Sequence, residues 1–435
     1  MDAGIVILII ISLFIIMLLL GIYIHVILFM TGIAGLVLLD GFSVLEGLVG
    51  NQPFNSVASF SLTTIPLFIL MAQFIMNANI IQEIFLLIRK LSKGKDWLLG
   101  VLTLLVGGLL GAVSGSGAAT AASLGQVAVP ELEKSGYHPP LAGAIAASAG
   151  SLSGIIPPSI ILILFGVSTE TSIGKLFIGA MIPGILTMLV FIFVILYYYF
   201  KYNKGVDKSS DVEAIDLDAK KLIVVILASF FIFITVFGGI YSGIVTPTEA
   251  AALGAFVALI TAAVLKKLNW AFLVKSLVET VKVSGMVLLI IVSANVFSRF
   301  VSLSMLPRTF IDLLNPIIDQ TILVLIILIL LYFVLFMFIE GGAVVLMTAS
   351  ISLPIIQAIE VDPIWFGVFI SLLCTIGLIT PPVGLSVYAV SGATNINSTS
   401  IFRYAMSFAV VSTVVVCTLL IMFPSLVLWL PGLME

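Results

Sequence analysis

Charged side chains are scarce in this sequence: Asp, Glu, Lys and Arg make up 9% of its 435 residues, whereas apolar residues make up 61%. Soluble domains usually carry about 25% charged and about 45–50% apolar residues. So few charges could not cover a water-soluble protein of this length, which excludes a cytosolic enzyme, a disordered chain and a nucleic-acid-binding protein. Several apolar runs exceed the roughly 18–20 residues that cross a bilayer as a helix. The composition therefore predicts an all-α polytopic membrane protein.

Cysteine and histidine are equally scarce, with two residues of each. Cys374 and Cys417 lie inside apolar runs, so no disulfide framework is expected. His25 and His138 stand far apart along the chain, which leaves little material for a zinc site or for histidine-based catalysis. The sequence has no GxxxxGK[ST] phosphate loop, so ATP is not the expected energy source. These absences argue against an enzyme.

A single long polar segment divides the chain and is interpreted as a cytoplasmic linker. In the second half, Thr246-Pro247-Thr248-Glu249 predicts a helix that begins at Pro247, with Thr246 as its cap. The predicted order is N-terminal scaffold helices (1–56), a first repeat with arm helix (78–95), hairpin and broken helix (57–200), the linker (201–221), scaffold helices (222–282) and a second, inverted repeat (283–435). The spans expected after the linker are 222–241, 247–265, 283–300, 321–338, 363–379 and 404–430.

The two halves align without a gap over 114–158 at a constant offset of 224 residues. Pro130 matches Pro354, and Pro157-Pro158 matches Pro381-Pro382. Basic residues then indicate orientation, because cytoplasmic segments carry an excess of Lys and Arg. The arm is basic, whereas its repeat partner at 302–319 has no excess of positive charge. Conversely, the segment before the 283–300 span is basic, whereas its counterpart at 42–58 has no Lys or Arg. Equivalent elements should therefore face opposite sides of the membrane, as in inverted-topology repeats.

Each half contains two places where an apolar helix is interrupted: 111–117 and 153–159 in the first, 336–342 and 377–384 in the second. Proline frees a backbone carbonyl, and glycine or serine allows a tight reversal. In a bilayer such freed groups are tolerated only where protein or a wet cavity satisfies them. Re-entrant hairpins and broken helices that meet at mid-membrane supply oxygens for Na⁺ and helix N-termini for an anion. We therefore predict an ion and substrate site at these breaks.

Two charged residues stand within or beside predicted spans, where charge is costly and tends to be functional. Glu340 stands at the turn of the second half. It could orient a cation or a polar substrate group, or be a wet interfacial carboxylate. Arg299 stands near the end of the 283–300 span. It could pair with a substrate carboxylate, or extend to the membrane surface.

Several motifs, in order over nearly the whole chain, resemble the large membrane subunit of TRAP (tripartite ATP-independent periplasmic) transporters. They are Ile65–Leu70 (IPLFIL), Ser114-Gly115-Ser116, Gly136-Tyr137, Ile155–Ser159 (IIPPS), Tyr241–Ala251 (YSGIVTPTEAA) and Gly377–Gly384 (GLITPPVG). Family members often have Asp where this chain has Thr120, and many have Gly where it has Ser153 and Phe336.

The resemblance implies an elevator-type ion transporter fold with two Na⁺ sites made mostly of backbone carbonyls. Carried over by position, the first site involves Gly111, Ser114, Ser153, Ile156 and Pro158, and the second involves Phe336, Gly377, Thr380 and Val383. The candidate substrate contacts are Ser114, Ser116, Thr120, Ser153, Glu340 and Arg299.

The resemblance also implies a multi-pass protein of the bacterial or archaeal inner membrane that imports a small organic anion, such as a dicarboxylate or a sialic-acid-like sugar acid. Its expected partners are a small four-helix membrane subunit and a periplasmic substrate-binding protein. No cofactor is expected, and Na⁺ is the coupling ion. One alternative is a stand-alone Na⁺/organic-anion symporter of similar architecture. Another is a channel or a non-transporting scaffold, although a scaffold has no use for paired helix breaks.

Overall fold

The computed structural model describes residues 3–78, 95–114, 116–202 and 230–434, together with positions 80, 84, 85, 92, 224, 227 and 228. It does not describe the side chains of residues 46–52 and 112–114. Most of the predicted arm helix (78–95) and of the predicted linker (201–221) lies outside the described residues.

Every regular element in the described part of the chain is a helix, which confirms the predicted all-α class. The first half contains α1 (Ala3–Leu19), α2 (Ile24–Asp40), α3 (Ser43–Val57), η1 (Phe60–Thr63), α4 (Thr64–Asn77), α6 (Asp96–Ser114), α7 (Gly117–Lys134), α8 (Pro139–Ser151), η2 (Leu152–Gly154), α9 (Ile160–Ser168), α10 (Ile173–Gly179) and α11 (Met181–Tyr202). The second half contains η3 (Ile234–Gly238), α13 (Gly239–Tyr241), α14 (Pro247–Val264), α15 (Trp270–Leu303), α16 (Leu306–Leu314), η4 (Asn315–Ile317), α17 (Thr321–Phe338), α18 (Gly341–Ala358), α19 (Pro363–Gly377), α20 (Leu385–Ala393), α21 (Ser398–Ser412), η5 (Thr413–Cys417), α22 (Thr418–Met422) and α23 (Ser425–Gly432). Seven helices of the described part are long and apolar enough to cross a membrane.

The helix boundaries repeat at the offset found in the sequence. Helix α7 begins at Gly117 and ends at Lys134, and α18 begins and ends 224 residues later, at Gly341 and Ala358. Helices α8 and α19 begin at the matched residues Pro139 and Pro363. Helices α2 and α14 lie at nearly the same offset, so the repeat extends well beyond the 114–158 window.

Helix α15 differs from its predicted span. The sequence predicted 283–300, but the helix begins at Trp270, where Asn269 Oδ1 accepts a hydrogen bond of 2.8 Å from the N–H of Phe272. The extra turns carry Lys275, Glu279 and Lys282, so hydropathy alone did not mark them as helical. The Lys282–Glu279 pair, 2.9 Å apart, supports the helix there. The predicted domain boundary between 282 and 283 therefore falls inside one continuous helix.

Two other boundaries follow local chemistry. Helix α14 begins at Pro247 with the predicted capping box: Thr246 Oγ1 accepts from the N–H of Glu249 at 3.3 Å, and Glu249 Oε2 accepts from the N–H of Thr246 at 2.8 Å. The predicted span 404–430 is instead divided, because Pro424 separates α22 from α23.

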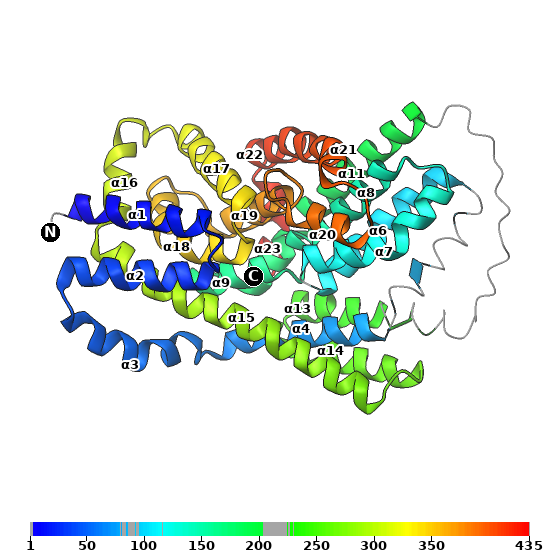
Figure 1. Cartoon of the computed structure of the whole chain (residues 1–435), viewed down its shortest axis with the longest axis horizontal. Coiled ribbons are helices and arrows are strands. Elements are labelled where there is room, and N and C mark those ends of the chain that lie inside the picture. Colours follow the sequence, from blue (N-terminus) through cyan, green and yellow to red (C-terminus); the bar gives the residue numbers. More distant parts are fainter. Residues whose placement is uncertain are drawn as a thin grey trace.

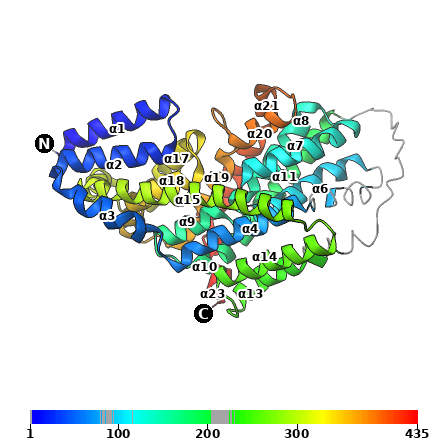
Figure 2. The ribbon, with the colours of Figure 1, turned by 60° about the horizontal axis from the view of Figure 1, so that its bottom comes forward.

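Helices α2, α4, α14 and α15 form a scaffold band along one side of the molecule (Figures 1 and 2). Helices α2 and α15 approach so closely that a Cβ added at Gly32 would lie 2.9 Å from the backbone nitrogen of Phe297. Helices α4 and α14 are joined by the buried hydroxyls of Thr64 and Thr248, 2.6 Å apart. Asn77 Nδ2 donates to Ser276 Oγ at 3.0 Å and joins α4 to α15.

The two repeats exchange contacts in the centre of the molecule, where Figure 1 shows α17 to α20 between α1–α2 and α6–α8. Helix α7 of the first repeat packs on α20 of the second, and α18 of the second packs on α9 of the first. The second helix of each hairpin thus lies on the broken helix of the other repeat. This exchange brings all four helix breaks into one region.

Candidate functional site

The first hairpin closes tightly against the first broken helix. Helix α6 ends at Ser114 and α7 begins at Gly117. A Cβ added at Gly111 would lie 2.9 Å from Ser153 Cβ, and one at Gly117 would lie 3.1 Å from Ser153 Oγ. The buried Ser153 therefore lies against both arms of the hairpin, and the absence of a side chain at Gly111 allows its backbone to approach Ser153 closely.

The first break frees the carbonyl of Gly154, where η2 ends. That oxygen accepts a hydrogen bond of 2.7 Å from Ser159 Oγ and a second from Ser371 Oγ of α19. The peptide bond between Pro157 and Pro158 is cis, and α9 resumes at Ile160. Of the residues predicted for the first Na⁺ site, the structure brings Gly111 and Ser153 into contact, with Ile156 and Pro158 in the same break and Ser114 at the end of α6.

At the second break, too, a glycine of one segment lies close to a residue of the other segment. A Cβ added at Gly377 would lie 2.6 Å from Phe336 Cβ and 2.9 Å from the Phe336 carbonyl oxygen. After the cis Pro381–Pro382 bond, the N–H of Val383 donates to the carbonyl of Met337 at 3.3 Å. The structure thus gathers the four residues predicted for the second site, because Thr380 lies between Gly377 and this bond.

An enclosed space adjoins the second break. It measures about 100 Å³ and is lined by Phe336, Glu340, Cys374, Leu378 and Val383 among others. Thr380, which is not part of this lining, is buried in the same break, and its Oγ1 donates to the carbonyl of Ile376 at 2.7 Å. The hydroxyl oxygen keeps lone pairs that can accept, so backbone and hydroxyl oxygens supply the donor atoms here.

Glu340 caps a helix. Its Oε1 accepts from the N–H of Gly342 at 3.0 Å and its Oε2 accepts from the N–H of Ala343 at 3.2 Å, so the carboxylate offsets the positive end of α18. The equivalent cap of α7, 224 residues earlier, is the neutral Ser116, which accepts from the N–H of Ala119 at 3.3 Å. The first turn of α7 has no acidic residue. The two hairpins therefore differ in electrostatics: the cap of α18 is a carboxylate, whereas the cap of α7 is neutral.

The other two predicted contacts lie in different surroundings. Thr120 is 2% exposed and stands in the first turn of α7, next to the hairpin tip. Arg299 lies on an exposed part of α15 and lines neither the small space at the second break nor the large chamber described below. The structure thus brings Thr120 to the hairpin tip and does not include Arg299 in the lining of either space.

A chamber of about 1180 Å³ is lined by parts of α4, α14 and α15 of the scaffold band on one side and of α9, α10 and α18 on the other, although α15 also packs directly on α18. Its walls are rich in hydroxyl and amide groups, such as Ser56 from α3, Thr246 from the start of α14 and Ser350 from α18. Sequence reasoning missed this chamber, because its lining comes from many segments. One signal was present: Asn295, Ser298 and Ser302 share one face of α15 by their helical spacing.

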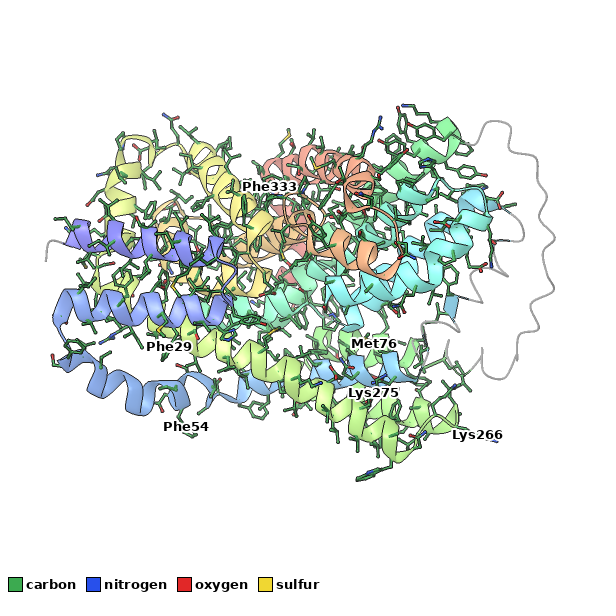
Figure 3. The ribbon with its side chains drawn as sticks, in the orientation of Figure 1. Phe29, Phe54, Met76, Lys266, Lys275 and Phe333 are labelled. Atoms are coloured by element: carbon green, nitrogen blue, oxygen red, sulfur yellow. The ribbon has the colours of Figure 1, made fainter. Side chains whose placement is uncertain are left out.

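The chamber has a defined side relative to the basic residues. It includes the first residues of α14, whereas Lys266 and Lys267 follow the last, about 27 Å away for an 18-residue helix. Figure 3 shows Lys266 and Lys275 near one end of α15 and Phe54, which precedes the chamber residue Asn55, near its other end. The chamber therefore opens at the end of the scaffold that lacks this basic cluster.

A family profile decides the relationship of the chain to known proteins: the DctM component of the tripartite ATP-independent periplasmic transporters matches residues 11–426. The chain belongs to this family. It is a component of a membrane transport system and not an enzyme, and it is a multi-pass protein of the bacterial inner membrane.

Curated TRAP proteins show the same relationship. A sialic acid TRAP transporter large permease of Vibrio cholerae is 30% identical over 386 residues, which cover 88% of each chain. A 2,3-diketo-L-gulonate large permease of Escherichia coli is 31% identical and covers 78% of this chain and 79% of its own. An isethionate TRAP permease of Oleidesulfovibrio alaskensis is 32% identical over 80% of this chain, which spans only 55% of that protein.

A solved structure shares the fold. The YdaH transporter of Alcanivorax borkumensis superposes with a TM-score of 0.62 over 91% of this chain and 88% of its own, at 14% identity. The identity is low, so this likeness concerns the fold alone.

Proposed function

We propose that this chain is the subunit through which a small organic anion crosses the membrane together with Na⁺. The observation that carries the proposal is the convergence of four helix breaks in two repeats, with Gly111 against Ser153 and Phe336 against Gly377. Both places offer neutral oxygens, from carbonyls and from the hydroxyls of Ser153 and Thr380. Uncharged oxygens suit a monovalent cation that must bind and leave again.

The asymmetry of the hairpins supports a substrate position beside the first one. An anion gains from the positive end of a helix, and Glu340 already offsets that end in α18. The end of α7 is capped by the neutral Ser116 and followed by Thr120. The relatives named above carry sialic acid, 2,3-diketo-L-gulonate and isethionate in their names. A small organic anion is therefore the proposed substrate class.

The chamber supports entry from the periplasm. By the excess of Lys and Arg in cytoplasmic segments, the Lys266 end of α14 faces the cytoplasm, so the chamber at its other end faces the periplasm. The chamber interrupts part of the contact between the scaffold and α18, and incomplete packing of this kind suits a transport body that moves against a scaffold. We therefore propose elevator-type import, with the substrate delivered by a periplasmic binding protein and with a small four-helix membrane subunit beside the scaffold.

Reconstitution tests the proposal and its alternative. The chain is placed in liposomes alone, with the small subunit, and with both partners, and uptake of a substrate bound by the partner protein is measured at fixed membrane potential. We expect saturable uptake only in the complete system and only with Na⁺ outside. Robust uptake by the chain alone would favour the stand-alone symporter. Uptake indifferent to Na⁺ would refute the coupling, and an ion current without saturable flux would indicate a channel.

A further inference from the structure

The carbonyl of Gly154 is a point at which the two repeats are tied together inside a helix break. The oxygen accepts hydrogen bonds from Ser159, in the same break, and from Ser371, which is 217 residues away on α19. Both serines are fully buried. The backbones are close as well, because a Cβ added at Gly154 would lie 3.2 Å from the backbone nitrogen of Thr375. The first break therefore rests directly on a helix of the second repeat.

This tie has no counterpart at the second break. The residue that matches Ser371 at the repeat offset is Ala147, which has no hydroxyl. The residue that matches Gly154 is Leu378, whose carbonyl accepts from the backbone N–H of Ser386 at 3.0 Å, within the same repeat. The hydroxyl of Ser371 thus gives a link that runs only from α19 to the first break.

Helix α19 continues from this link into the second break. It ends at Gly377, which lies against Phe336 in the second candidate Na⁺ site. Gly377 follows Ser371 by six positions, which corresponds to a rise of about 9 Å along a helix. Such a short helical segment transmits a shift as a rigid unit. Any movement of Gly377 on ion binding therefore moves the hydroxyl that holds Gly154.

We propose that Ser371 is a positioning residue that couples the two Na⁺ sites. This role rests on the proposed function. The two Na⁺ sites fill cooperatively because Ser371 holds the Gly154 carbonyl in place. With Gly154 held, the neighbouring Ser153 stays seated between Gly111 and Gly117. Without the Ser371 hydroxyl, the Gly154 carbonyl keeps the hydrogen bond from Ser159, and a shift of α19 is no longer transmitted to the first break.

The test compares three Ser→Ala variants in the complete transporter. Na⁺ titrations of uptake are run for Ser371→Ala, Ser159→Ala and Ser148→Ala, and the Na⁺-dependent rise in thermal stability is measured in parallel. Ser148 is a matched control, because it is fully buried on α8 and its hydroxyl has no hydrogen-bond partner among the described residues. Ser371→Cys keeps the size and a weak donor, and it replaces Ser371→Ala if that variant does not fold.

We expect a Hill coefficient for Na⁺ above one in the wild type and in Ser148→Ala. Ser371→Ala should bring the coefficient close to one and raise the half-saturating Na⁺ concentration about fivefold, the effect of one buried hydrogen bond. Ser159→Ala should raise that concentration and keep the coefficient, and Ser371→Cys should fall between wild type and Ser371→Ala. An unchanged coefficient in Ser371→Ala, or a wild type that responds to Na⁺ with a coefficient of one, would overturn the coupling. A wild type without any Na⁺ response would overturn the proposed function as well.

Discussion

Gly377 offers the most direct test of the second candidate ion site. A Cβ at this position would lie 2.6 Å from Phe336 Cβ and 2.9 Å from the Phe336 carbonyl oxygen, whereas ordinary contacts measure 3.4–4 Å. To reach ordinary contact, Gly377→Ala therefore needs the two segments to part by roughly 0.5 Å at the Phe336 carbonyl proposed to bind Na⁺, and by somewhat more at Phe336 Cβ. Overpacking a well-filled interior costs about 1–3 kcal/mol. If this cost falls on the ion-bound state, the half-saturating Na⁺ concentration rises about five- to hundredfold, since 1.4 kcal/mol is tenfold.

Gly285→Ala is the matched control for this substitution. Gly285 lies inside α15, and a Cβ there would meet no atom within 4 Å. Alanine in a helix interior is about 0.5–1 kcal/mol more favourable than glycine, so this variant should be slightly more stable and transport normally. The assay is a Na⁺ titration of uptake in the complete transporter, with thermal unfolding measured at low and high Na⁺. A folded Gly377→Ala variant with the Na⁺ dependence of the wild type would refute the reasoning.

Three further predictions concern the second hairpin, formed by α17 and α18, and the chamber. Glu340→Ala should lower thermal stability by about 0.5–2 kcal/mol in an unfolding assay, because α18 loses its charged cap; no loss would contradict the capping role. Tyr332→Phe should lower the free energy of unfolding by about 1–3 kcal/mol in the same assay. The reason is that the buried Tyr332 hydroxyl donates to Ser352 at 2.9 Å and accepts from Thr348 at 2.7 Å. Tyr388→Phe is the control, because Tyr388 is half-exposed and its substitution should leave the stability unchanged. Ser302→Cys should react with a membrane-impermeant thiol reagent added from the periplasm, whereas Ser304→Cys, 2% exposed on the same end, should not; the reverse pattern would argue against a periplasmic chamber.

The positions of the helix breaks could be predicted because their chemistry is local. Proline pairs and glycine–serine turns interrupt a helix whatever surrounds them, so 153–159 and 377–384 are breaks in the structure as expected. The repeat could be predicted for the same reason, since Pro139 and Pro363 start helices by a local rule. The capping box at Thr246 is a third local signal that the structure confirms.

Other features of the structure were not predicted from the sequence. The roles left open for Glu340 did not include a helix cap, because capping depends on where α18 begins. The early start of α15 was hidden because Lys275 and Lys282 lower its hydropathy, although the helix continues through them. Arg299 carried a charge in an apolar run, but only the packing of α15 determines that it is exposed and does not line the chamber.

The sequence by itself determined that this protein lies in a membrane, that its two halves repeat, and where its helices break, because composition and backbone chemistry act over short distances. Only the tertiary structure decided which helix of one repeat packs against which helix break of the other. The exchange of α7 onto α20 and of α18 onto α9 places Ser371 on the Gly154 carbonyl and opens a hydroxyl-lined chamber beside the scaffold. Packing selects such pairings because a carbonyl freed inside an apolar body must find a donor, and the nearest donor is set by the fold and not by the order of residues.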